Sequence, residues 1–283
     1  MQLLRNPVRP YAWGSRTVIA ELLGKPVPAP HPEAELWIGA HPADPSMLLG
    51  QGGVERSLLE ALDADPERHL GAHSVDRWGV RLPFLVKILA AEEALSLQAH
   101  PSAALAEEGF RREEAAGIPR DAANRDYPDP MAKPELLCAL GEFHALAGFR
   151  DVHRSVELLK ALPAKGLASY TLLLAEAMDS DGLRALFTTW VTLPQPALDA
   201  LLPEVLEACV EHVRCHGEFS DECRTVLELG EAYPGDAGVL CALLLNRLTL
   251  APGEAIYLPA GNLHAYLRGT GLEILGNSDN VLR

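Results

Sequence analysis

A block of helical periodicity in the middle of the chain, residues 151–236, is the feature that most constrains what this sequence can fold into. Runs such as DVHRSVELLKAL and PALDALLPEVLEACVEHVRC repeat apolar residues every three or four positions, as amphipathic helices do. The segments on both sides, from LPFLVKILAA to GLEILGNSDNVLR, are instead typical of strands joined by turns. We therefore predict a mainly β body, formed by residues 1–150 and 237–283, with a helical insertion between its two parts.

Composition disfavours several classes of protein. The 283 residues carry a formal net charge of −15 without a long basic run, so a nucleic-acid backbone would be repelled. No apolar stretch is long enough to span a bilayer, and the opening MQLLRNPVRPYAWGS lacks the apolar core of a signal peptide. The five cysteines form no CxxC pair. We expect a reduced, cytoplasmic monomer with no nucleic-acid or membrane partner, in which an anionic substrate would need local Lys or Arg side chains.

Polar residues alternate in the segment LSLQAHP, residues 95–101, directly after an apolar run. Ser96, Gln98 and His100 occupy every second position, so in a strand their side chains would share one face. The amide oxygen of Gln98 and a ring nitrogen of His100 could then reach a common point. This pattern indicates a polar site at the end of an otherwise buried strand.

Two further segments supply matching groups. In MAKPELL, Lys133 and Glu135 are two residues apart, and GEAIYLPAGNLHAY reads as a strand, a tight turn and then His264. Two imidazoles, one carboxylate and one amide oxygen would therefore come from three separate strands. Such a set suits a divalent transition metal such as zinc, with room left for water or substrate.

Each of these residues also has an ordinary structural explanation. A lone histidine is more often a hydrogen-bonded structural residue, and Glu135 after a proline could be a solvated strand end. Two histidines and one carboxylate also form the facial triad of iron oxygenases, although Gln98 as a fourth ligand would fill a position that oxygen needs. Lys87, inside LVKIL, is harder to explain away, because a lysine on a buried strand needs a partner or a water-filled cavity.

The turn motif resembles that of a known superfamily. The spacing Gly253-x5-Pro259-x-Gly261-x2-His264 is similar to the second motif of the cupins, which are small β-barrels, with Arg268 where that motif has asparagine. More closely, the whole chain resembles type I mannose-6-phosphate isomerases through PYAWGS, ELWIGAHP, LPFLVKIL, LSLQAHP, DPMAKPELLCAL, LPAGNLHAYL and GNSDNVLR, in this order. The resemblance implies a cupin-type β-barrel or jelly-roll body with an inserted α-helical lobe.

The resemblance also implies a ligand set and a reaction. One zinc ion per chain would be held by the residues that match the family's ligands, namely Gln98, His100, Glu135 and His264. The reaction would interconvert mannose 6-phosphate and fructose 6-phosphate through an enediol-type intermediate, with this sugar phosphate as the partner. The positions expected to be catalytic are Arg283, Lys133, Glu273 and Asp279, and those expected to bind substrate or phosphate are Ser96 and Lys87.

The sequence leaves the roles within this group open. Glu273 and a neutral Lys133 are both candidates for the base that moves the C2 proton, and Asp279 is a candidate for ring opening. Phosphate needs cationic or hydroxyl donors, for which we expect Ser96, Lys87 and Arg283.

The family continues past SDNVLR with a second β-domain, whereas this sequence stops at Arg283. We expect that β-domain to be absent, Arg283 to be loosely held at a chain end, and the zinc site to form with weak turnover. The alternative function is that of a truncated, non-catalytic cupin that binds metal or sugar.

Overall fold

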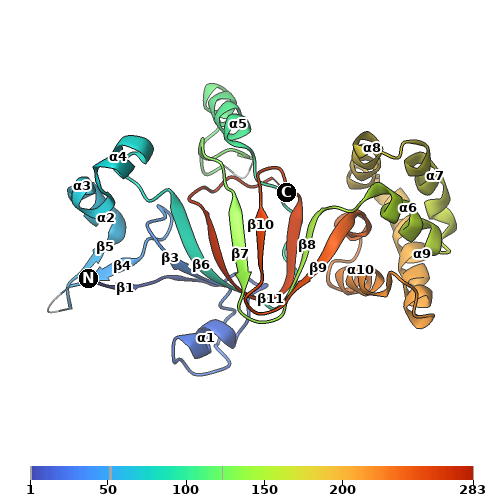
Figure 1. Cartoon of the computed structure of the whole chain (residues 1–283), viewed down its shortest axis with the longest axis horizontal. Coiled ribbons are helices and arrows are strands. Elements are labelled where there is room, and N and C mark those ends of the chain that lie inside the picture. Colours follow the sequence, from blue (N-terminus) through green and yellow to red (C-terminus); the bar gives the residue numbers. More distant parts are fainter. Residues whose placement is uncertain (1, 51–52, 123, 283) are drawn as a thin grey trace. The chain divides into compact units, whose positions relative to one another are not determined.

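The chain folds into a mixture of α-helices and β-strands (Figure 1). The computed structural model describes residues 2–50, 53–122 and 124–282. These divide into two compact units, one formed by the residues up to Ala145 together with those from Thr249 on, and one formed by Leu146–Leu248. The helical insertion predicted at residues 151–236 falls inside the second unit.

The first unit is built on a sheet whose neighbouring strands run antiparallel. Its main path has the order β10-β7-β11-β6-β3-β2, and β8 pairs with β11 and with β9. The strands are β2 (Val8–Arg9), β3 (Glu35–Ile38), β6 (Phe84–Ala91), β7 (Glu135–Ala139), β8 (Phe143–Phe149), β9 (Leu245–Leu250), β10 (Ala255–Leu258) and β11 (His264–Gly276). Strands β8 and β9 carry the chain between the two units.

Burial alternates along residues 272–275 of β11. Glu273 and Leu275 are buried, whereas Leu272 and Ile274 are exposed, as the sequence GLEIL predicts. On the buried side of β6 lies Lys87, directly opposite Glu273 in the strand register. The buried face is therefore apolar at its ends and ionisable in its middle.

Smaller elements complete the first unit. A second sheet has the order β1-β4-β5, made of β1 (Leu3–Arg5), β4 (Met47–Leu49) and β5 (Glu55–Ser57). The helices are α1 (Val18–Leu22), α2 (Leu58–Ala64), α3 (Pro66–Leu70), α4 (Ala72–Trp78) and α5 (Ala103–Ala115). These helices make the first unit less purely β than the sequence indicated.

The second unit is helical. Its helices are α6 (Val152–Ala161), α7 (Ala168–Glu176), α8 (Ser180–Val191), α9 (Gln195–Arg214), α10 (Ser220–Ala232) and α11 (Gly238–Cys241), with 3-10 turns at Lys165–Leu167 and Ala242–Leu244. Pro203 lies inside α9 without dividing it. None of the helices in the described part of the chain combines the length and the hydropathy needed to span a bilayer.

Two segments differ from the structure that their sequence indicates. The run VLCALLL, expected as the start of a strand, forms α11 and a 3-10 turn, and the strand begins only at Leu245. An uninterrupted apolar run has no periodicity that separates a buried helix from a buried strand. Residues 95–101 form an extended segment outside the named strands, joined to them by isolated bridges from Gln98 to His264 and from Ala99 to Leu282.

Candidate metal centre and active site

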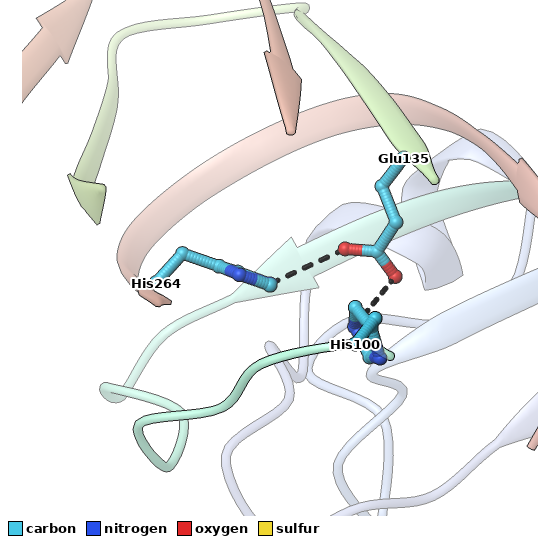
Figure 2. A group of neighbouring side chains, drawn as sticks. All are labelled: His100, Glu135 and His264. Carbon is cyan, nitrogen blue, oxygen red and sulfur yellow. Dashed lines mark ion pairs between the residues drawn. The ribbon is translucent and has the colours of Figure 1, made fainter. Parts of the chain in front are cut away.

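Three buried side chains from separate segments meet at one point. The Nε2 atom of His100 lies 3.1 Å from Glu135 Oε1, and the Nε2 atom of His264 lies 3.2 Å from Glu135 Oε2. Figure 2 shows both rings directed toward the carboxylate. One ligand atom from each residue can be chosen so that all three lie within 4.8 Å of one another. This spacing is what a single metal ion requires of its donors.

Hydrogen bonds fix which nitrogen of each ring is free. His100 Nδ1 lies 2.7 Å from the carbonyl oxygen of Asn280, and His264 Nδ1 lies 3.0 Å from that of Asn262. A carbonyl only accepts, so both Nδ1 atoms carry a proton and the Nε2 atoms are the ones that face Glu135. These two Nε2 atoms and Glu135 Oε2 are buried without a hydrogen-bond partner among the described residues. Unpaired buried acceptors that face one point fit a cation.

Glu135 is ionised in this setting. Burial alone would raise the pKa of its carboxyl, but His100, His264 and Lys133 together hold that pKa well below the ordinary value. Lys133 Nζ stands 3.6 Å from Glu135 Oε1. The centre therefore offers one carboxylate and two imidazole Nε2 atoms.

Gln98 enters the same region through its backbone. Its N–H donates to the carbonyl of His264 and its carbonyl accepts from the N–H of His264, both at 2.9 Å. Residues that exchange both bonds in an antiparallel bridge lie directly opposite, with their side chains on the same side. The side chains of Gln98 and His264 therefore leave their backbones in the same direction.

The turn before His264 is tied to the segment of His100. Gly261 has a φ of +81°, a conformation that side-chain-bearing residues rarely adopt, and Asn262 N–H donates to the Pro259 carbonyl across the turn. The N–H of Gly261 donates to the carbonyl of His100 at 2.7 Å. The Pro–x–Gly turn thus fixes the position of His264, at the start of β11, relative to the segment of His100.

A buried network of charges lies beside this centre on β3, β6 and β11. Lys87 Nζ stands 3.3 Å from Glu35 Oε1 and 3.9 Å from Glu273 Oε2, so the buried lysine has the partners that its sequence context requires. Despite burial, which lowers it, the pKa of Lys87 is raised by Glu35, Glu273 and Glu135. Trp37 Nε1 donates to Glu35 at 2.7 Å. Lys87 is thus held as a cation between two carboxylates.

The carboxyl of Glu273 has a pKa that is shifted to near neutrality. Burial, together with the negative charges of Glu135 and Glu35, raises its pKa to about 7, although Lys87 and the Tyr266 hydroxyl oppose this rise. The same side chain is 2% exposed. The pKa of Lys133 is lowered by burial and by the positive charge of Lys87. A carboxyl that titrates near neutrality suits proton transfer.

Asp279 pairs with a residue that the sequence analysis did not select. His41 Nε2 lies 3.3 Å from Asp279 Oδ1, and His41 Nδ1 accepts from the N–H of Ala43, so Nε2 carries the proton. Hydrogen bonding to His41 lowers the pKa of Asp279. His41 is buried against Trp37, with ring centroids 4.9 Å apart, whereas the Asp279 side chain is 59% exposed. The motif ELWIGAHP contained this histidine but gave no spacing that linked it to Asp279.

Two predicted positions remain. Ser96 is exposed and precedes both bridges of its segment. Arg283 lies outside the described residues. The structure therefore brings together His100, Glu135, His264 and Lys133, places Lys87 and Glu273 next to each other, and pairs Asp279 with His41.

Fold and site together define a β-sheet protein with a buried His–Glu–His metal centre. Residues 1–152 match the model of the family described as phosphomannose isomerase type I, catalytic domain. Mannose-6-phosphate isomerase from Salmonella typhimurium is 41% identical over 283 residues, which are all of this chain and 70% of that protein. The Bos taurus enzyme is 34% identical over 294 residues, spanning 98% of this chain and 67% of its own length. The chain belongs to the type I phosphomannose isomerase family.

Solved structures agree with this placement. The structure of mannose 6-phosphate isomerase from Salmonella typhimurium bound to the substrate f6p and zinc superposes with a TM-score of 0.88 at 40% identity, covering 100% of this chain and 70% of that one. A zinc-bound holo structure of mannose 6-phosphate isomerase gives the same TM-score and identity.

Proposed function

We propose that this chain is a zinc-dependent mannose-6-phosphate isomerase, which interconverts mannose 6-phosphate and fructose 6-phosphate. The observation that carries the proposal is the convergence of two imidazole Nε2 atoms on the ionised Glu135 in a buried site. Its relatives bear this name at 34–41% identity, and one of them binds zinc and f6p.

The metal would be held by His100, Glu135 and His264, with Gln98 as fourth ligand. Gln98 is included because its backbone is paired with His264, which directs the two side chains the same way. Zinc bound there would supply Lewis-acid stabilisation of negative charge on the oxygens of the substrate. Lys133, next to Glu135, would add positive field in the same shielded region.

Glu273 is the group that best suits proton transfer between C2 and C1 of the open-chain sugar. Removing the C2 proton gives an enediolate, and returning that proton to C1, with transfer of the O2 hydroxyl proton to O1, gives the ketose. A base is most effective when its pKa lies near the working pH, and that of Glu273 is about 7. Tyr266 Oη donates to Glu273 Oε1 at 2.7 Å and so orients the carboxylate. Lys87 compensates its charge once the proton has left.

Ring opening needs a proton to move between the ring oxygen and the C1 hydroxyl. Asp279 is exposed enough to meet the sugar, and the Nε2–H of His41 holds its carboxylate in the ionised form. We assign ring opening to Asp279, and we retain Ser96, Lys87 and Arg283 as the phosphate-binding residues. Lys87 has two proposed roles, to compensate the charge of Glu273 and to bind phosphate. Its contacts with two carboxylates favour the role beside Glu273.

The fold has a corresponding finer assignment. The antiparallel sheet, which carries Glu135 and His264, together with the bridged segment of Gln98 and His100, would be the cupin-type body of the catalytic domain, residues 1–150 and 237–283. The helices between them would form an inserted lobe that supplies no ligand. The support for this assignment is the Gly–Pro–Gly–His turn and the antiparallel strand order.

A paired measurement tests the function. Metal analysis of the purified chain should find one zinc per chain, and a coupled assay that oxidises glucose 6-phosphate formed from fructose 6-phosphate should report turnover of mannose 6-phosphate. Both signals should be lost in His264→Ala. Zinc and sugar binding by the wild type without any turnover would support instead a non-catalytic cupin.

A further inference from the structure

One carboxylate organises the segment that ends in the active site. Asp129, in the loop before β7, accepts the hydroxyl of Ser278 at 2.9 and 3.0 Å to its two oxygens. It also accepts the N–H of Asp279 at 2.8 Å and the N–H of Met131 at 2.9 Å. Asp129 is partly buried. Its carboxylate oxygens accept hydrogen bonds from two stretches of chain, at Met131 and at Ser278–Asp279.

Backbone carbonyls of the first stretch join the same two stretches a second time. The side-chain amide of Asn280 donates to the carbonyl oxygens of Asp129 and Met131, both at 2.8 Å. The N–H of Asn280 donates to the hydroxyl of Ser278 at 3.1 Å, and Asn280 is completely buried. We call the residues Asp129, Met131, Ser278 and Asn280 the loop clamp.

The loop clamp contacts His100, a proposed metal ligand, through Asn280. The carbonyl of Asn280 accepts the Nδ1–H of His100 at 2.7 Å. Two residues later, Leu282 and Ala99 exchange backbone hydrogen bonds at 2.9 and 3.0 Å. The position of residues 280–282 therefore decides both the tautomer and the orientation of the His100 ring.

We propose that Asp129 is a positioning residue of the metal centre, which acts through Ser278 and Asn280 on His100. The inference deepens the proposed function, because the metal is the one assigned there. A hydrogen bond from a ligating histidine to a carbonyl fixes the ring and raises its basicity, and loss of such partners typically costs about 10–100-fold in metal affinity. Asp129 contacts the residues that hold His100 and not His100 itself, so its loss should weaken metal affinity by on the order of tenfold.

A different possibility is that Asp129 only braces the loop. In that case its removal would lower the stability of the fold and leave the metal affinity of the folded protein unchanged. The two possibilities are separated by measuring metal binding without substrate, at a temperature well below unfolding.

The test compares three variants of the whole chain. Asp129→Asn keeps the shape but removes the charge and one acceptor oxygen, and Ser278→Ala removes the hydroxyl that Asp129 accepts. Asp126→Asn makes the same change at an exposed position of the same loop and is the control. Metal-free protein is titrated with zinc against a chromophoric chelator, and the visible spectrum of the Co²⁺-loaded form is recorded.

We expect Asp129→Asn and Ser278→Ala each to weaken zinc binding about tenfold and to alter the Co²⁺ spectrum, while Asp126→Asn matches the wild type. The double variant should lose little more than either single one, because both act through the same contact. If Asp129→Asn fails to fold, Ser278→Ala carries the test. Zinc affinity within about twofold of the wild type in the folded variants, with an unchanged Co²⁺ spectrum, overturns the proposal. If the wild type binds zinc but has no turnover, the proposed isomerase function is refuted, while the positioning role of Asp129 is still tested by the zinc affinities.

Discussion

The hydroxyl of Tyr266 donates a 2.7 Å hydrogen bond to Glu273 Oε1, and both side chains are 2% exposed. This bond favours the ionised carboxylate and so opposes the burial that raises the pKa of Glu273 to about 7. The bond therefore lowers the pH at which Glu273 becomes a base.

The first prediction concerns this pair. With Glu273 as base, kcat/KM should fall as the pH drops below about 7, because protonation removes the base. Tyr266→Phe removes a stabilising donor, so the acidic limb should move to higher pH by about one unit. pH–rate profiles of the two proteins measure this shift. Exposed Tyr257→Phe is the control and should keep the wild-type profile. An unmoved acidic limb in Tyr266→Phe would exclude Glu273 as the titrating base.

The second prediction concerns the fourth ligand. Gln98→Ala should weaken zinc binding on the order of tenfold, while His100→Ala should abolish stoichiometric binding, because an amide oxygen is a weaker donor than imidazole. Chelator competition gives both affinities. Gln195→Ala, at an exposed helix start, provides the matched control. Wild-type affinity in Gln98→Ala would remove this residue from the ligand set.

The third prediction concerns the His41–Asp279 pair. Asp279→Asn should lower kcat about 100-fold, within the range of general acid–base catalysis, and His41→Ala should lower it less, because the carboxylate itself remains. Zinc content should stay at one per chain in both variants. His31→Ala, at an exposed position, should behave as the wild type. Full activity in Asp279→Asn would show that solvent or another residue, and not Asp279, opens the sugar ring.

The fourth prediction concerns the buried lysine. Lys87→Met leaves Glu35 and Glu273 without their shared cation, which should lower the free energy of unfolding by about 3–5 kcal/mol at pH 8, above the pKa of about 7 of Glu273. The loss should shrink as the pH falls through about 7, since protonated Glu273 needs no cation. Urea denaturation at pH 8 and pH 6 measures both values. Lys25→Met breaks the pair of the exposed Lys25 with the partly buried Glu33 and should cost less than Lys87→Met, by the same amount at either pH. A loss that is equal at both pH values would show that the coupling is not to Glu273.

The sequence by itself determined the kinds of group at the centre and the segments that carry them. Alternation in GLEIL and in LSLQAHP, and the turn residues before His264, are local patterns that reflect the geometry of extended chain and tight turns. The same is true of the helical periodicity inside Leu146–Leu248. Such patterns depend only on the local conformation of the chain, which is why the sequence alone predicts them.

Only the tertiary structure decided which groups touch. His41 and Asp279 are separated by more than two hundred residues, as are Glu35 and Glu273, and nothing in the local sequence of either pair refers to the other. The loop clamp likewise joins Asp129 to Ser278 across the chain and delivers the carbonyl of Asn280 to His100. The altered pKa of Glu273 depends on burial and on charges from three other strands, so it exists only once the sheet has formed.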